Sequence, residues 1–256
     1  ERAVLENLFV LEKGRLLWRY GNETLLIQPW GENSLRVRST FLPQMPPEDW
    51  ALTEPVNAVA ETAMEEDGSA RITCGRITAK VSPKGKIAFY NQKGKLLLQE
   101  YRTEGRHALH KEPREFIPTP GGDWALTARF ESEPREKLFG MGQYQQPYLD
   151  IKGCTLELAQ RNSQASVPFC LSSLGYGILW NNLAVGEVTF GKNITEWKAR
   201  STRALDYWIT AGDTPAQIEE AYAAVTGTVP IMPEYGLGFW QCKLRYLCQE
   251  ELLEVA

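Results

Sequence analysis

The sequence predicts a mainly β protein, in which a large antiparallel β-sandwich is followed by one junction helix and then by the opening strand and helix of a parallel α/β domain. Residues 1–212 consist of short apolar or alternating runs separated by glycine, asparagine and proline, a pattern typical of strands and turns. A helical period first appears at 214–226. Residues 236–256 then change to one apolar strand and the start of an amphipathic helix. We therefore divide the chain into a sandwich with its junction helix, 1–228, and the start of a second domain, 229–256.

The first forty residues predict a meander of short strands. Residues 34–39 alternate polar and apolar side chains, which predicts a strand with one face in water. Residues 42–66 hold four prolines and several acids, so we expect a surface loop there. Residues 103–122 have three prolines and both histidines, and we expect irregular structure. Apolar or alternating runs predict further strands at 70–74, 76–81, 87–90, 96–98, 124–130, 167–171, 177–180 and 204–210.

Glycine is dense between residues 139 and 190, where turns and strands alternate. Gly140-Met-Gly142 is too short for a phosphate-binding loop, so we interpret it as a tight turn between strands. The helix that follows this block has clear end signals. Thr214 suits the N-cap, Pro215 suits the first turn, and Gly227 ends the helical period.

The last 21 residues predict a βα unit. Residues 236–246 have the apolar character of a buried strand, and a helix is expected from Gln249, with acids in its first turn. A single βα unit cannot bury its own apolar face. We therefore expect the chain to be the front portion of a larger protein, truncated at Ala256.

Composition limits the classes of partner. A net charge of −4 with scattered lysines and arginines gives no basic surface for nucleic acid or anionic membrane, and no apolar run is long enough to span a bilayer. Five widely spaced cysteines without a CxxC pair predict reduced thiols and a cytoplasmic protein, although N-x-T triplets at Asn22 and Asn193 point the other way. His107 and His110 lack acidic or sulfur ligands nearby, so we expect no metal and no cofactor.

No catalytic motif is evident in the sequence. The acids in ordered regions, Asp150, Glu157, Glu187 and Asp206, form no evident pair, and we interpret them as solvated surface carboxylates. Two loops differ, because Phe139-Gly-Met-Gly-Gln-Tyr-Gln145 and Gln160-Arg-Asn-Ser163 combine aromatic rings, amides and a guanidinium. Such groups stack on sugar faces and hydrogen-bond to sugar hydroxyls, although ordinary turn and core roles are an open alternative.

Several motifs together resemble one enzyme family. Phe139-Gly-Met-Gly-Gln143, Gln160-Arg-Asn162, Val167-Pro-Phe169 and Gly175-Tyr-Gly-Ile-Leu-Trp180 resemble the N-terminal β-domain of glycoside hydrolase family 31. Gly212-Asp-Thr-Pro-Ala-Gln-Ile-Glu-Glu-Ala-Tyr222 is similar to the junction helix of that family, and Gly238-Phe-Trp-Gln-Cys-Lys-Leu-Arg-Tyr246 is similar to strand 1 of its (β/α)8 catalytic barrel. The resemblance implies a galactose-mutarotase-like sandwich followed by the first βα unit of a TIM barrel.

The resemblance also implies a function. Members are retaining α-glycosidases, including α-xylosidases and α-glucosidases, whose two catalytic aspartates lie on later barrel strands. Those strands are missing here, so we expect no catalytic residue in this chain and no activity of the chain alone. Arg161 and Asn162 match a loop that shapes the leaving-group subsite, where related α-glucosidases carry Arg-Asp. Arg245 and Trp240 would bind substrate from barrel strand 1, although barrel core is an equal alternative for the tryptophan.

Two other interpretations stay open at this stage. The chain could be a non-catalytic carbohydrate-binding or scaffolding sandwich, or an unproductive truncation. The expected partners are an α-glycoside substrate and the remainder of the chain's own barrel. The sequence leaves open homo-oligomerisation, the choice between xylose and glucose, hydrolysis against transglycosylation, and what preceded Glu1.

Overall fold

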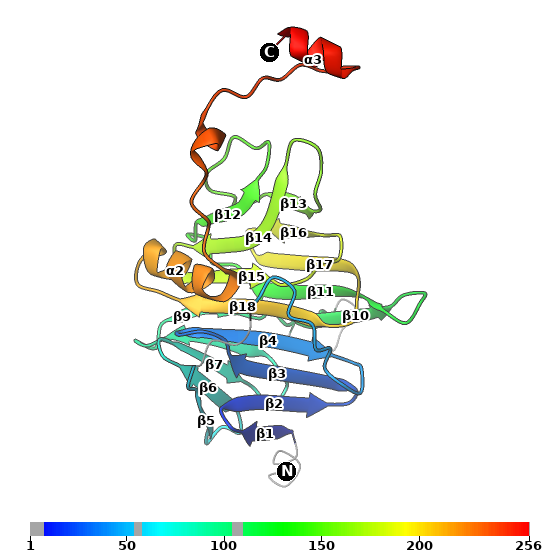
Figure 1. Cartoon of the computed structure of the whole chain (residues 1–256). Coiled ribbons are helices and arrows are strands. Elements are labelled where there is room, and N and C mark those ends of the chain that lie inside the picture. Colours follow the sequence, from blue (N-terminus) through cyan, green and yellow to red (C-terminus); the bar gives the residue numbers. More distant parts are fainter. Residues whose placement is uncertain (1–7, 54–57, 104–109, 256) are drawn as a thin grey trace.

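The computed structural model describes residues 8–53, 58–103 and 110–255, which form two layers of antiparallel sheet (Figure 1). One layer is a single eight-stranded sheet, and the other consists of two five-stranded sheets. The eight-stranded sheet runs in the order β1 (Phe9–Glu12), β2 (Arg15–Tyr20), β3 (Glu23–Pro29), β4 (Ser34–Thr40), β18 (Leu205–Ala211), β15 (Tyr176–Trp180), β14 (Ala165–Ser172) and β12 (Leu138–Gln143).

The two smaller sheets face this large one. One has the order β5 (Glu61–Met64), β6 (Ala70–Cys74), β7 (Ile77–Val81), β8 (Ile87–Asn91) and β9 (Leu96–Gln99). The other has the order β10 (Arg114–Pro118), β11 (Trp124–Glu131), β17 (Ile194–Thr202), β16 (Gly186–Phe190) and β13 (Thr155–Leu158). A bridge between Glu100 and Phe130 joins them side by side. The described part of the chain is thus the mainly β sandwich that the alternating runs predict.

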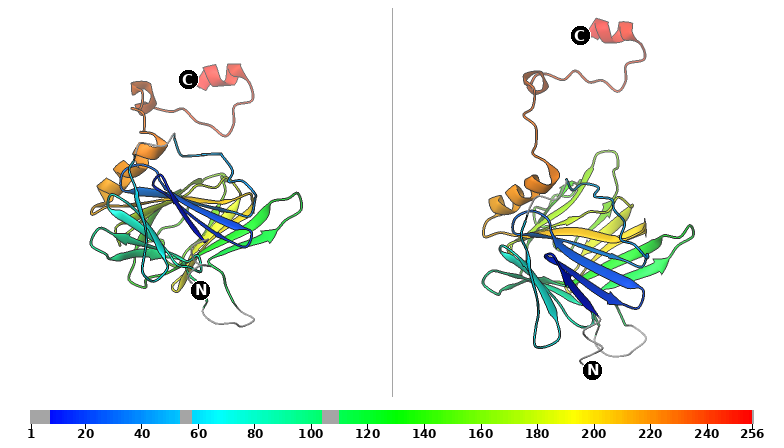
Figure 2. Two further views of the ribbon diagram at one scale, coloured as in Figure 1. Left: turned by 90° about the horizontal axis from the view of Figure 1, so that it is seen from below. Right: turned by 60° about the horizontal axis from the view of Figure 1, so that its bottom comes forward.

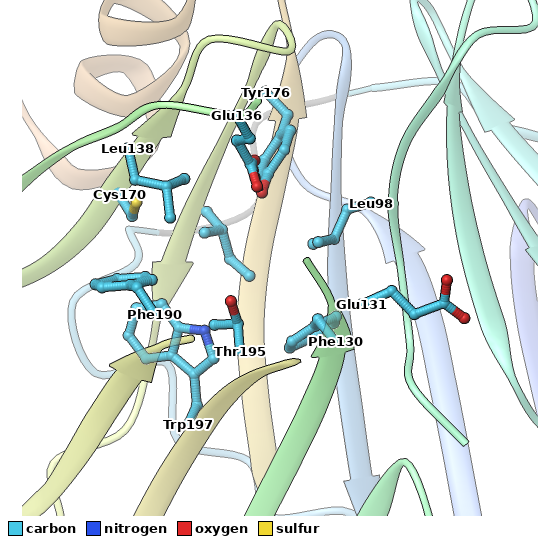
Figure 3. Close-up of a pocket in the computed structure, with 11 residues that line it drawn as sticks. Leu98, Phe130, Glu131, Glu136, Leu138, Cys170, Tyr176, Phe190, Thr195 and Trp197 are labelled. Atoms are coloured by element: carbon cyan, nitrogen blue, oxygen red, sulfur yellow. Dashed lines mark hydrogen bonds between the residues drawn. The ribbon is translucent and has the colours of Figure 1, made fainter. Parts of the chain in front are cut away.

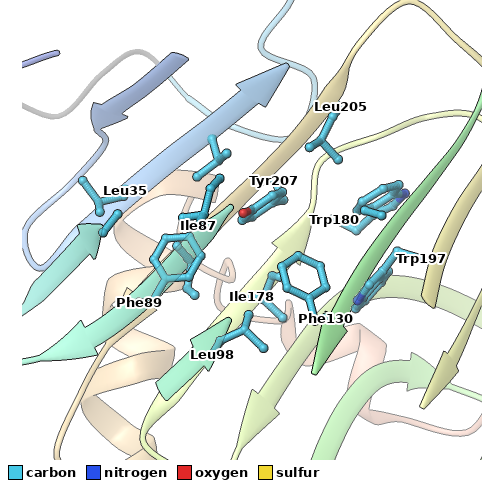
Figure 4. Close-up of a cluster of buried hydrophobic side chains, with 14 of the residues drawn as sticks. Leu35, Ile87, Phe89, Leu98, Phe130, Ile178, Trp180, Trp197, Leu205 and Tyr207 are labelled. Carbon is cyan, nitrogen blue, oxygen red and sulfur yellow. The ribbon is translucent and has the colours of Figure 1, made fainter. Parts of the chain in front are cut away.

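Aromatic side chains from all three sheets fill the space between the layers (Figure 4). Tyr207 of β18 packs edge-on against Phe89 of β8 and Phe130 of β11, with ring centroids 6.3 and 5.7 Å apart. Trp180 and Trp197 stack across the layers at 5.5 Å. Each large ring buries much apolar area, and this burial stabilises the packing of the two layers.

A buried ion cluster also links the sheets. Arg114 of β10 bonds to Glu100 after β9 through Nη1 at 2.5–2.6 Å, and to Glu23 of β3 through Nε at 2.6 Å. Its Nη2 donates to the Gly85 carbonyl at 2.9 Å. Every polar atom of the guanidinium therefore has an acceptor, which is what a buried cation requires.

The predicted junction helix is confirmed as α2 (Pro215–Thr226). The Thr214 hydroxyl accepts from the Gln217 amide at 3.3 Å, and Gly227 ends the helix with φ 101°. Its buried face lies on the outer surface of the large sheet, where Tyr222 stacks on Phe169 at 4.0 Å. Because α2 and residues 46–52 cover the outer face and the core covers the other, all seven residues of β18 are buried.

Three local predictions are wrong. Residues 61–64, assigned to a loop, form β5 by pairing with β6, while 54–57 of that loop lie outside the described residues. Residues 114–118, assigned to irregular structure, form β10 against β11. Gly140 and Gly142 lie inside β12 at a bulge, not in a turn. In each case pairing with a neighbouring strand overrides the local composition.

The strand predicted at 236–246 does not form within the described part of the chain. A short 3₁₀ helix, η1 (Glu234–Leu237), begins the segment, and residues 238–248 form no ladder with any strand of the described chain. Figures 1 and 2 show this segment leading away from the sandwich. A strand needs a neighbour for its backbone hydrogen bonds, and no described strand lies beside these residues. The helix predicted from Gln249 is confirmed as α3 (Gln249–Val255), and no helix in the described ranges is long and apolar enough to cross a membrane.

Candidate functional site

A cavity between the layers is too small to hold a substrate. Its volume is about 10 Å³, and Glu136, Tyr176 and Cys170 line part of it (Figure 3). Glu136 is 5% exposed and accepts hydrogen bonds from Ser172 Oγ at 2.5 Å, Tyr176 Oη at 2.7 Å and Lys152 Nζ at 3.1 Å. Ligand pockets are far larger, roughly 300–1,000 Å³. We assign this cluster a structural role.

Burial sets the titration of the groups around that cavity. It raises the pKa of the Tyr176 phenol well above its ordinary value, and the charge of Glu136 adds to the effect. Burial likewise raises the pKa of the Cys170 thiol. Both groups therefore stay protonated at neutral pH, and Cys170 lacks the thiolate character of a nucleophile.

The loop between β13 and β14 holds Arg161 and Asn162, and side chains of its own tie it to the sheet. The Gln160 amide pairs twice with the Ser166 backbone, donating to its carbonyl at 2.7 Å and accepting from its N–H at 3.0 Å. Gln164 Nε2 donates to the Ala159 carbonyl at 3.0 Å. The two glutamine side chains thus add hydrogen bonds to the backbone and hold the loop in one conformation.

A tyrosine from the preceding connection braces the base of this loop. Tyr144 Oη donates to the Glu157 carbonyl and also contacts Ser166 Oγ, both at 2.7 Å. Tyr144 follows β12, so three successive elements meet at this point. In Figure 1 the loop and the segment after α2 both extend upward from the sandwich.

Arg161 is positioned by Glu157, four residues earlier. Arg161 Nε and Nη2 contact the two carboxylate oxygens at 2.9 and 2.7 Å, in the bidentate arrangement that fixes a guanidinium. The hydrogen bond from Arg161 lowers the pKa of Glu157, so this acid stays ionised. Asn162 is exposed, and its amide has no hydrogen-bond partner in the described ranges. The loop therefore presents a fixed cation next to a free amide.

Trp240 and Arg245 do not join that loop. Trp240 is 69% exposed, and its Nε1 donates to the Gly236 carbonyl at 3.1 Å. Arg245 is exposed and has no ion-pair partner within the described residues. No hydrogen bond or ion pair recorded in the described part of the chain connects either residue to Arg161 or Asn162. Of the four predicted site residues, only the two that are adjacent in sequence lie together.

Asp206 is not the surface carboxylate that the sequence suggested. It is 5% exposed. Its carboxylate accepts hydrogen bonds from Arg36 Nε at 3.0 Å, from Arg36 Nη2 at 2.6 Å and from Asn181 Nδ2 at 2.9 Å. The face of β4 predicted to lie in water is covered by residues 46–52, whose Asp49 pairs with Arg36 at 2.6 Å. The sequence signal for this burial is the position of Asp206 inside the apolar run 204–210.

The described residues contain no group of three His, Cys, Asp or Glu side chains that could hold a metal ion. His107 lies outside the described residues, and His110 Nε2 contacts Glu112 at 2.7 Å. All five cysteines are free thiols: Cys74, Cys154, Cys170, Cys242 and Cys248.

Comparison with known proteins assigns this fold to a family model. Residues 24–188 match the glycosyl hydrolase 31 N-terminal galactose mutarotase-like domain. The sequence is 50% identical over 254 residues to an uncharacterized family 31 glucosidase, ORF2, of Pseudescherichia vulneris, covering 93% of this chain and 48% of the relative. It is 31% identical over 277 residues to alpha-xylosidase A of Aspergillus niger, covering 98% of this chain and 37% of that relative.

The structure has a close counterpart. A GH31 alpha-xylosidase from a soil metagenome, solved with xylose, superposes with a TM-score of 0.90 and 55% identity. The match covers 96% of this chain and 38% of that one. The chain thus spans less than half the length of these relatives.

Proposed function

The chain belongs to glycoside hydrolase family 31, and we propose that it forms the N-terminal part of a retaining α-glycosidase that removes terminal α-xylosyl or α-glucosyl residues. The observation that carries this proposal is the 55% identity, over 96% of the chain, to a protein named as an α-xylosidase. The relative that is 50% identical is named a glucosidase. We therefore propose both α-xylosides and α-glucosides as substrates, with α-xylosides preferred.

A retaining mechanism constrains where the catalysis can occur. It needs two carboxyl groups about 5 Å apart, one attacking the anomeric carbon and the other protonating the leaving oxygen. Glu157 is held ionised by Arg161, so it is a poor proton donor, and Asp206 is buried under Arg36. We infer that both catalytic carboxyls lie outside residues 1–256 and that this chain alone does not cleave glycosides.

The sandwich then serves to shape the site. We propose that Arg161 and Asn162 border the subsite of the leaving group, where the guanidinium and the free amide can hydrogen-bond to sugar hydroxyls. We further propose that 229–256 is the first βα unit of a (β/α)8 barrel, in which Trp240 and Arg245 face the substrate. Residues 239–246 are largely exposed and pair with no strand of the described chain, which supports this proposal, because their backbone can pair with further barrel strands.

An assay of two proteins tests the function. We expect the full-length protein to release p-nitrophenol from an aryl α-xyloside or α-glucoside, with the α-anomer of the sugar formed first, as followed by NMR. Residues 1–256 alone should give no turnover. Activity of the short chain would overturn the assignment of the carboxyls, and inactivity of the full-length protein on both substrates would favour a non-catalytic carbohydrate-binding module.

The role of the loop is tested separately. Arg161→Ala in the full-length protein should raise KM for a disaccharide substrate about tenfold, the value of one charge-assisted hydrogen bond. Arg71→Ala is the matched control, because Arg71 forms an exposed pair with Glu65 in another sheet. Equal KM values for the two variants would remove Arg161 from the site.

A further inference from the structure

A cleft of about 350 Å³ lies outside the Arg161 loop. It forms where the β4–β5 segment, the β15–β16 connection and the β17–β18 turn meet, and the β10–β11 turn closes one side. Figure 1 shows the first part of the β4–β5 segment, in blue, crossing over β18. The cleft shares no residue with the loop of Arg161.

The backbone on both sides of an aromatic residue, Trp50, is fixed in this cleft. Trp50 is 53% exposed and has φ 54°, a conformation that costs a bulky residue about 1–2 kcal/mol. Its neighbours on both sides are fixed by one residue, since Asn181 Nδ2 donates to the Asp49 carbonyl at 3.0 Å and Asn181 Oδ1 accepts from the Ala51 N–H at 3.2 Å. An exposed tryptophan held in this way is a ready platform for a flat apolar surface.

A cation with an unused donor also lines the cleft. Arg38 donates to the Pro46 carbonyl at 3.1 Å and to Gln28 Oε1 at 3.2 Å, but its buried Nε has no partner and no carboxylate pairs with it in the described ranges. Burial and the neighbouring charge of Arg36 lower the pKa of Arg38. The buried Nε does not reach the cleft, but Nη1 and Nη2 each donate only one recorded hydrogen bond and keep a second N–H for a hydroxyl oxygen.

The other polar groups indicate a neutral ligand. Asp123 accepts one hydrogen bond from Ser201 Oγ at 2.9 Å and has a second carboxylate oxygen free. Arg203 lies 3.9 Å from Glu48, a loose exposed pair that leaves both groups available. The lining thus offers hydrogen-bond donors and acceptors, and positive and negative charges, beside the Trp50 ring. This combination suits a polyhydroxylated ring better than a phosphate or an acid.

We propose that this cleft binds a neutral saccharide of one or two pyranose units, with a sugar face on Trp50 and hydroxyls bonded to Arg38 and Asp123. Its volume is at the lower end of the range for ligand pockets, roughly 300–1,000 Å³, which suits that size. The site would let the domain hold a saccharide chain independently of the residues that cleave it. It goes beyond the proposed function and does not depend on it.

Oxidative footprinting of the full-length protein tests the site directly. Trp50 is oxidised with and without maltose, a xyloglucan oligosaccharide or mannitol, and its modification rate is read from peptide masses. We expect either saccharide to slow Trp50 oxidation at least about threefold, because stacking covers the ring, whereas mannitol has no pyranose face. Tyr20, 68% exposed on β2, is the internal control and should keep its rate. Equal Trp50 rates in all samples would overturn the proposal.

A variant pair links the protection to the cleft. Asp123→Ala should shift the saccharide concentration that half-protects Trp50 upward about tenfold, the value of one hydrogen bond to a charged group. Glu66→Ala, at an exposed acid in the turn between β5 and β6, should leave this concentration unchanged. Inorganic phosphate is the last probe, and protection by phosphate without protection by saccharides would make this an anion site and contradict us. Aryl glycoside cleavage reports the proposed function alone, so failure of one proposal leaves the other standing.

Discussion

Arg36 is fully buried in the middle of β4 and shares its guanidinium between Asp206 and Asp49. The Trp30 ring lies 4.4 Å from its charge centre. Alternation in 34–39 predicted a strand correctly, but it could not reveal that this arginine faces protein instead of water. That outcome depends on residues 46–52 folding back over the strand, which is a tertiary event with no local signal.

Removing Asp206 should therefore be costly. Asp206→Ala leaves a buried cation with half of its partners, and we expect a loss of about 3–5 kcal/mol in the free energy of unfolding, measured in urea. Glu187→Ala removes an exposed partner of Lys198 and should cost below about 1 kcal/mol. If the two variants lost equal stability, the pair of Arg36 and Asp206 would not be structurally important.

Glu196 gives a prediction for pH. Burial acts to raise its pKa, but the hydrogen bond and charge of Arg129 outweigh burial, so the pKa of Glu196 lies below its ordinary value of 4.5. A carboxyl with a lowered folded pKa stabilises the fold above its unfolded pKa, and this contribution disappears as pH falls through the folded value. Stability should thus decline below about pH 4.5 partly through Glu196.

The check compares urea midpoints at pH 7 and pH 3.5 for three proteins. Glu196→Gln should lose less stability between the two pH values than the unmodified chain does. Glu66→Gln, an exposed acid that forms no ion pair in the described ranges, should behave like the unmodified chain. If Glu196→Gln lost as much stability between pH 7 and pH 3.5 as the unmodified chain, other carboxyls would be responsible for the loss in acid.

At the scale of elements, the β12 bulge shows what short motifs hide. Gly140-Met-Gly142 has φ of 101°, 72° and 87°, and the register of β12 against β14 shifts between Gly140 and Gly142. Two glycines in a row of three predicted a turn because turns and bulges require the same backbone freedom. Only the pairing of the flanking residues with β14 tells the two apart.

Gly142→Ala should be strongly destabilising for the same reason. A Cβ there would overlap the Ala165 carbonyl oxygen and lie 2.7 Å from the Val167 nitrogen, in a backbone region that alanine disfavours. We expect a loss above about 2 kcal/mol, whereas Gly94→Ala, with φ 73° but no atom within 4 Å, should cost about 1 kcal/mol in thermal or urea unfolding. Equal losses would mean that backbone strain alone, without the steric overlap, governs both sites.

For the whole molecule, the sequence predicted the β class, the junction helix and most of the strands. It could not predict that one large sheet would face two smaller ones, because that arrangement depends on long-range contacts. Arg114, for example, joins β10 to Glu23 of β3, 91 residues earlier, and nothing local to either residue signals the pair. For the candidate site, the loop of Arg161 followed from its composition and family resemblance, while the cleft at Trp50 combines residues from four distant connections.

The C-terminal segment links this chain to the protein of which we propose it is part. Cys242 and Cys248 are exposed, whereas burial raises the pKa of Cys74 and of Cys170 and keeps both thiols protonated. In residues 1–256 alone, a thiol reagent at pH 8 should therefore label the first two cysteines rapidly and the second two only on unfolding.

If 238–248 becomes a barrel strand in the full-length protein, labelling of Cys242 should slow by at least about tenfold there, because a buried thiol reacts only through local opening. Peptide mass spectrometry locates the label, and the two buried cysteines are the control in both proteins. Rapid labelling of Cys242 in the full-length protein would contradict the barrel assignment of this segment, since a side chain in the middle of a barrel strand packs against the barrel interior or the surrounding helices.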